Sequence, residues 1–117
     1  MAKFLIDTHV FLWFSEGSKE LSQIARELIE DKGNHIYLSI ASLWEISIKS
    51  ATGKLNIARG YNTVIDDVVG NDIEILPINF AHTLVQNKFP FYHRDPFDRI
   101  IAAQAIVEGL PLISRDE

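Results

Sequence analysis

The chain has 117 residues, of which 16 are acidic and 11 are basic, and its formal net charge is −5 at pH 7. This length fits one domain, residues 1–117, and ordinary contents of hydrophobic (47%) and charged (23%) residues exclude a disordered protein. No apolar run approaches the roughly 20 residues of a membrane-spanning helix, and the N-terminal apolar stretch is too short for a secretory signal. The absence of cysteine excludes disulfides, thiolate zinc sites and cysteine nucleophiles. We therefore expect a cytoplasmic protein with no membrane contact.

Short apolar runs and helical patterns alternate in the first half of the chain. Residues 4–6 are apolar and end at Asp7, which is typical of a buried strand, and an apolar helix is expected over residues 9–14. The next expected elements are an amphipathic helix that begins after Ser18 or Ser22 and stops at Gly33, a strand over residues 35–40, and a helix that begins after Ser39 or Ser42 and ends near Gly53.

The alternation continues in the second half. The expected elements are a weaker helix over residues 61–69, a strand over 73–78, a helix over 80–87 capped by Asn79, an aromatic and basic loop over 89–94, a helix over 96–107 and a strand over 110–114. Asp95 before Pro96 is typical of a helix N-terminus. Strands that alternate with helices predict an α/β fold of three layers, with a central, mostly parallel β-sheet flanked by helices.

Acidic residues follow the predicted strands. Asp7 follows the first strand, Glu45 lies early in the helix after the second, and Asp116 follows the fourth by two residues. Asp98 lies at the start of the helix that leads into the fourth strand, and Asp95 lies nearby. Carboxyl ends of parallel strands and the N-termini of crossover helices share one edge of a sheet, where ligands bind. We therefore expect these carboxylates to point into one crevice.

Such a cluster predicts a metal site. Clustered carboxylates repel one another, and Mg²⁺ or Mn²⁺, which prefer oxygen ligands and keep several waters, would remove that cost. The chemistry that needs this arrangement is phosphodiester hydrolysis by a metal-activated water. The net charge argues by itself against a nucleic-acid partner. Without the five acids, however, 11 acidic residues remain against 11 basic ones, so the surplus describes the predicted site.

Each acid also has a structural interpretation. Asp7 and Asp95 would serve as helix caps, and Asp98 would be favoured by the helix dipole. Glu45 would lie on a solvated helix face or pair with Lys49 one turn later, and Asp116 would be a solvated charge. The aromatic residues are interpreted mainly as core, and any that are exposed would mark a dimer or partner surface; these are Phe11, Trp13, Phe14 and Trp44.

Four ordered motifs carry a family resemblance. They are FLIDTH at residues 4–9, SLWEI at 42–46, HRDPFDR at 93–99 followed by AAQA at 102–105, and SRD at 114–116. These motifs resemble PIN-domain proteins, and within them the VapC toxins of bacterial toxin–antitoxin pairs. The resemblance implies a Mg²⁺- or Mn²⁺-dependent endoribonuclease that acts on RNA, forms a homodimer and binds a cognate antitoxin.

The resemblance assigns the four family acids to this sequence. They fall on Asp7, Glu45, Asp98 and Asp116, as catalytic residues and metal ligands. Asp98 is preferred over Asp95 as the third acid because small residues stand five and seven positions after it, so Asp95 is kept as a cap, an alternative ligand or a supporting residue. Hydroxyls that could support the site come from Thr8 and Ser114. Relatives continue past the fourth acid, so the family's C-terminal segment is expected to be missing.

Other roles and functions remain open. Arg94 and Arg99 flank the third motif and could contact RNA phosphates or balance nearby acids. One alternative function is a non-catalytic metal- or partner-binding module. A second is a phosphatase with Asp7 as nucleophile, which fits less well because residue 9 is His and not a second Asp.

Overall fold

The computed structural model describes residues 2–90 and 95–115. The predictions for Arg94 and Asp116 therefore lie outside the described residues. The elements are β1 (Lys3–Ile6), α1 (Thr8–Glu16), α2 (Gln23–Glu30), β2 (His35–Ser39), α3 (Ile40–Ala51), the 3₁₀-helix η1 (Tyr61–Thr63), α4 (Val64–Gly70), β3 (Glu74–Leu76), α5 (Phe80–Asn87), α6 (Pro96–Glu108) and β4 (Leu112–Ile113). Within the described ranges, no helix is long and apolar enough to cross a membrane.

The four strands form one parallel sheet in the order β3-β2-β1-β4. β1 pairs with β2 from Lys3 opposite His35 to Ile6 opposite Leu38, and Ile6 also lies opposite Ile113 of β4. Because the strands are parallel, the carboxyl ends of β1, β2 and β4 lie at one edge. This confirms the predicted α/β fold with a central sheet flanked by helices.

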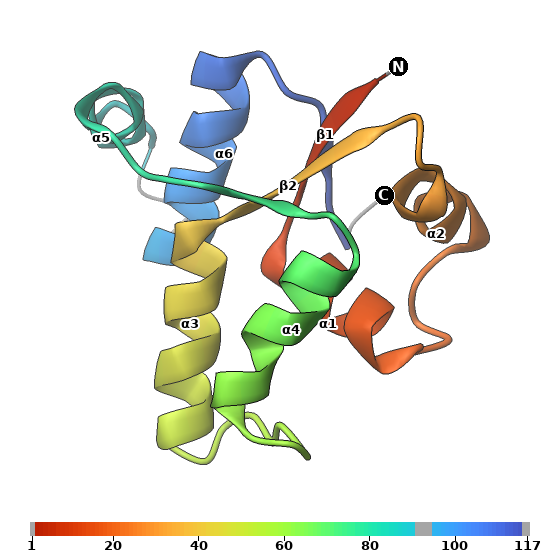
Figure 1. Cartoon of the computed structure of the whole chain (residues 1–117). Coiled ribbons are helices and arrows are strands. Elements are labelled where there is room, and N and C mark those ends of the chain that lie inside the picture. The colour runs from red at the N-terminus through yellow and green to blue at the C-terminus, as the bar shows by residue number, and fades with distance from the viewer. Residues whose placement is uncertain (1, 91–94, 116–117) are drawn as a thin grey trace.

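Helices cover the two faces of the sheet, and the alternation of side chains along β1 explains how. Ile6 joins a large core with Phe11 of α1 and residues of α2, α3 and α4, whereas Leu5, one position earlier, joins a smaller core with Ile101 of α6. Figure 1 shows α5 and α6 on one side of the strands and α2 on the other. Successive residues of a strand face opposite sides, so each strand supplies both cores.

Local signals explain most helix boundaries. The Ser22 hydroxyl accepts a hydrogen bond from the Ala25 N–H, which makes Ser22 the cap of α2, and Ser39 caps α3 in the same way. Gly17 ends α1 in the left-handed conformation that favours glycine. β3 and β4 contain only three and two residues and are shorter than the apolar runs that predict them.

One prediction about the core is wrong. Phe11 is fully buried and Trp13 and Phe14 pack against the core, but Trp44 is 61% exposed and contacts the ring of Phe97 edge-on. The next two side chains of α3 are buried, so Trp44 lies on the outward face of its helix. Hydrophobicity alone does not tell which apolar residues of a broad helical stripe face the protein.

Candidate active site

Asp7 stands directly after β1 and fixes its carboxylate with two backbone donors. Its Oδ1 accepts a hydrogen bond from the Val10 N–H at 2.8 Å, which caps α1, and its Oδ2 accepts one from the Arg115 N–H at 3.2 Å. Burial raises the pKa of Asp7 above its usual range, and the two backbone hydrogen bonds oppose that rise. The predicted cap is therefore real, and the same carboxylate also links the ends of β1 and β4.

Asp95 is the N-cap of α6, as its position before Pro96 predicts. Its Oδ1 accepts hydrogen bonds from the N–H groups of Phe97 at 2.9 Å and Asp98 at 3.4 Å. Asp95 is exposed and holds the first turn of the helix that carries Asp98. Its capping role is thus confirmed.

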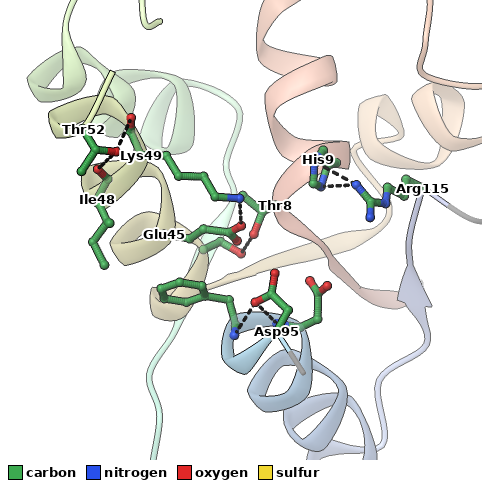
Figure 2. A network of polar contacts seen from close by, with 11 residues as sticks. Thr8, His9, Glu45, Ile48, Lys49, Thr52, Asp95 and Arg115 are labelled. Atoms are coloured by element: carbon green, nitrogen blue, oxygen red, sulfur yellow. Dashed lines mark hydrogen bonds and ion pairs between the residues drawn. The ribbon is translucent and has the colours of Figure 1, made fainter. Parts of the chain in front are cut away.

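Asp98 lies in the first turn of α6 among other negative charges. Loss of hydration raises the pKa of its carboxyl, and the neighbouring charges of Asp95, Glu45 and Asp7 raise it further, whereas Arg115 lowers it. The acids that raise this pKa come from the end of β1, from α3 and from the residue before α6, in agreement with their expected place at one edge of the sheet. Figure 2 shows the carboxylates of Glu45 and Asp95 directed from their two helices toward the same space.

Glu45 of α3 is 2% exposed and pairs with Lys49 one turn later. Its Oε2 accepts a hydrogen bond from the Lys49 ammonium at 2.6 Å, while its Oε1 is buried and has no hydrogen-bond partner among the described residues. The predicted pair with Lys49 is confirmed, but the predicted alternative of a solvated helix face is wrong. A buried carboxylate oxygen without a partner costs free energy, so this atom is a good candidate ligand for a cation.

Two cavities adjoin these carboxylates. The Asp98 cavity, of about 260 Å³, is lined by Asp7, His9, Phe89, Asp98, Arg99, Ile101, Ala102, Leu112, Ser114 and Arg115. The Lys54 cavity, of about 220 Å³, is lined by Thr8, His9, Leu12, Trp13, Glu16, Glu45, Ile46, Lys49, Lys54 and Leu55. The acids expected in one crevice are thus not gathered in one cavity: Asp7 and Asp98 line the first, Glu45 lines the second, and Asp95 lines neither, while His9 lines both.

The two candidate supporting hydroxyls have different surroundings. The Thr8 hydroxyl is buried and donates a hydrogen bond to Oγ of Ser42 at 2.9 Å, which ties the start of α1 to α3. Ser114 lines the Asp98 cavity at the end of β4. Thr8 therefore supports the site by joining the elements that carry Asp7 and Glu45.

Arg99, which the sequence offers as an RNA contact, has a structural role. It is 9% exposed, and its guanidinium donates hydrogen bonds to the carbonyl oxygens of Gln86, Phe89 and Pro90 at 2.8–3.1 Å. These carbonyls belong to the last turn of α5 and the segment after it, whose acceptors need partners outside the helix. Arg99 thus fixes α5 and the segment after it to α6, and its guanidinium is engaged in these contacts.

Comparison with known proteins identifies the family. The model of the PIN domain family matches residues 4–117. The chain belongs to the PIN domain family. PIN domains are generally nucleases and typically use divalent metals, so membership supports a nuclease function. No curated protein matches the chain.

The acids of this PIN domain fit a divalent cation by their chemistry. Within residues 2–90 and 95–115, no three acidic or histidine side chains form a group that could hold one ion directly. Mg²⁺ keeps several of its waters and needs only one or two carboxylates in direct contact, so a looser set of acids suffices. Carboxylate oxygens are the preferred donors, and the unpartnered Oε1 of Glu45 is one of them.

Two basic residues of this PIN domain were not assigned from the sequence. The guanidinium of Arg115 lies 3.1 Å from Nε2 of His9 beside the Asp98 cavity, and Lys54 lines the other cavity. Arg115 belongs to the fourth motif, in which the family resemblance gives a role to the neighbouring Asp116 and none to the arginine. Lys54 follows Gly53, where the chain turns back at the end of α3, and only the fold shows which helix it then faces.

Proposed function

We propose that this PIN domain is a metal-dependent endoribonuclease that hydrolyses RNA with an activated water and no covalent protein intermediate. Asp7, Glu45 and Asp98 would hold Mg²⁺ or Mn²⁺ directly or through its bound waters, and Asp116, from the fourth motif, would complete the site. The supporting observation is that these acids are not fully compensated by the protein. Among the described residues, Glu45 Oε1 is buried without a hydrogen-bond partner, and Asp98 has three other acids near it. A divalent cation would offset this negative charge.

Each side chain would contribute in a defined way. A bound divalent cation lowers the pKa of its water and neutralises charge on the phosphate oxygens. Two backbone N–H groups hold the Asp7 carboxylate at the end of β1, and Lys49 holds one oxygen of Glu45 so that the other stays available. Asp95 fixes the first turn of α6 and thereby the position of Asp98.

The test is cleavage of RNA by the purified chain with Mg²⁺ or Mn²⁺, with EDTA as control. We expect metal-dependent cleavage, and calorimetry with Mn²⁺ should show binding that the Asp98→Asn variant has lost. Cleavage that persists in EDTA would contradict the metal mechanism. Metal binding without cleavage of any RNA would instead favour a non-catalytic metal- or partner-binding module.

We further propose that the protein is the toxin of a toxin–antitoxin pair, acts in the cytoplasm as a homodimer, and is held inactive by a cognate antitoxin. The order of the four motifs supports the VapC-like subtype, and exposed apolar side chains such as Trp44, Val69 and Phe80 support protein partners. We expect growth arrest when the chain is expressed alone and rescue when the neighbouring reading frame is co-expressed. Light scattering should give the mass of two chains, and a monomeric mass would contradict the dimer.

A further inference from the structure

The Asp98 cavity and the Lys54 cavity share His9 but carry different basic residues. Of these two cavities, Arg115 lines only the first, and Lys49 and Lys54 line only the second. Asp7 and Asp98 line the first cavity, whereas Glu45 lines the second. The acids are therefore divided between two cavities that share His9, and each cavity also has an exposed basic residue of its own.

We propose that the two cavities form one RNA-binding groove in which a single strand crosses the carboxylates. Lys54 binds a backbone phosphate on one side of the scissile bond, and Arg115 binds a backbone phosphate on the other side. This inference rests on the proposed nuclease function and adds the path of the substrate and the residues that bind it. A protein of net charge −5 needs such local cations to hold a polyanion beside acidic residues.

Lys54 is suited to a phosphate because its charge is available. It is exposed, and no salt bridge involving it occurs in the part of the chain that the structure describes. Its backbone N–H donates to the carbonyl oxygen of Lys49 at 2.9 Å, which turns the chain back toward the end of α3. The Lys49 ammonium, in contrast, is already paired with Glu45 at 2.6 Å. Of the two lysines in this cavity, Lys54 is the one with charge to offer a ligand.

Arg115 is the corresponding exposed basic residue of the Asp98 cavity. Its backbone is anchored to Asp7, and its side chain is exposed and contacts the ring of His9. A guanidinium offers a planar fork of donors that matches a phosphate. Arg99 lines the same cavity, but its guanidinium already binds the carbonyls that follow α5. Of the two described arginines that line this cavity, Arg115 is therefore the one whose guanidinium can bind substrate.

Two aromatic side chains that line the Lys54 cavity favour the binding of single-stranded RNA. His9 and Trp13 lie one helical turn apart on α1, with ring centroids 6.0 Å apart and planes inclined by 59°. Both rings line the cavity, and Trp13 is partly exposed. Unpaired bases stack on aromatic side chains regardless of sequence, whereas paired bases do not present their faces. The nucleotide next to the Lys54 phosphate can thus place its base against Trp13.

The first experiment measures binding without cleavage. In an Asp98→Asn background, fluorescence anisotropy with labelled oligouridine is recorded over a range of salt concentrations. We expect Lys54→Gln and Arg115→Gln each to weaken binding about fivefold at about 0.1 M salt and to reduce the salt slope by about 0.7. Lys54→Arg should restore the slope. The matched control is Lys32→Gln, in the turn before β2 at the opposite end of the sheet, which should change neither quantity.

The second experiment tests the two sides separately. Once the cut made by the wild-type protein is mapped, single phosphates around it are replaced by neutral methylphosphonates. We expect one replacement to abolish the rate difference between wild type and Lys54→Gln, and a replacement on the other side of the cut to do so for Arg115→Gln. The proposal would be overturned if the replacements that abolish the two rate differences lay on the same side of the cut. It would also be overturned if no replacement abolished either difference. If the wild type cleaves no RNA, the proposed function fails, and unchanged salt slopes in the first experiment would then separately refute the groove.

Discussion

Glu45 and Asp98 lie at the same edge of the sheet, but the protein compensates their charges differently. Glu45 is buried and has its own cation, because Lys49 lies one turn later on the same helix. Asp98 is exposed, has Asp95 and Glu45 as neighbours, and has a raised pKa. Glu45 is thus paired with a cation within the fold, whereas Asp98 is repelled by its neighbours at a cost in folding free energy. A residue held at a cost to stability is typical of a functional site.

Replacement of Asp98 should give the largest effect. We expect Asp98→Asn to lower metal-dependent RNA cleavage more than about 100-fold, because a ligand to the cation is lost. The same variant should melt at a higher temperature than wild type in EDTA, since a repelled charge is removed. Asp95→Asn is the matched control, because asparagine also caps helices and should keep most of the activity. Normal cleavage by Asp98→Asn with loss in Asp95→Asn would transfer the ligand role to Asp95.

Removal of Lys49 should turn Glu45 into a second uncompensated acid. We expect Lys49→Met to destabilise the metal-free protein by about 2 kcal/mol, because a buried carboxylate loses its cation. The double variant Glu45→Gln/Lys49→Met should recover most of that loss. Lys54→Met, in the same cavity, should stay within about 0.5 kcal/mol of wild type. Urea denaturation in EDTA measures all three, and equal losses in the single and double variants would show that packing, and not charge, is responsible.

Asp7 differs from Glu45 and Asp98 because its carboxylate caps α1 and also has a raised pKa. Asp7→Asn keeps the hydrogen bond from the Val10 N–H but loses the one from the Arg115 N–H, because an amide nitrogen cannot accept it. Removal of a partly buried charge offsets this loss, so the variant should lose activity but little stability. Asp7→Ala should lose activity equally and about 1 kcal/mol of stability in addition, because the cap of α1 is gone. Thermal and urea unfolding distinguish the two variants. A similar stability for both would mean that the cap is unimportant to α1.

The smallest effect should appear as a pH dependence. A carboxyl whose pKa is higher in the folded than in the unfolded state binds protons more readily when folded, so its contribution to stability falls as pH rises through that interval. We therefore expect the difference in melting temperature between Asp98→Asn and wild type, measured in EDTA, to be near zero at acidic pH and to grow toward neutral pH. Saturating Mg²⁺ should reduce the difference at neutral pH. A difference independent of pH would assign the effect to packing.

Local sequence patterns predicted most of the fold. The alternation of apolar runs and helical spacing gave the order of elements, and Asp95-Pro96 marked the start of α6, because these features depend on neighbouring residues. The ends of β3 and β4 were placed less well, since strand length depends on how far a partner strand extends. Trp44 was misplaced for the same reason, because its neighbours in space belong to distant segments.

The places of the candidate acids in the fold were predicted, but their arrangement relative to one another was not. The positions of Asp7, Glu45 and Asp98 at one sheet edge followed from the parallel topology. Their division between two cavities could not be foreseen, because it depends on how the side chains of α1 and α3 pack. Arg99 shows the same limit, since its carbonyl partners lie 9 to 13 residues away in a loop that no local pattern connects to it.

The hydrogen bond from the Arg115 N–H to Asp7 spans 108 positions of the chain. A ribosome adds about 5 to 20 residues per second, so Asp7 is made several seconds before the residue that anchors it. During that interval β1 lacks β4 as a neighbour, and α6 with Asp98 has been completed only shortly before. A growing chain therefore carries an incomplete site until Arg115 has been added. For the proposed ribonuclease, which would be made in the presence of its own messenger RNA, this order of synthesis delays activity until β4 and Arg115 can pack beside β1.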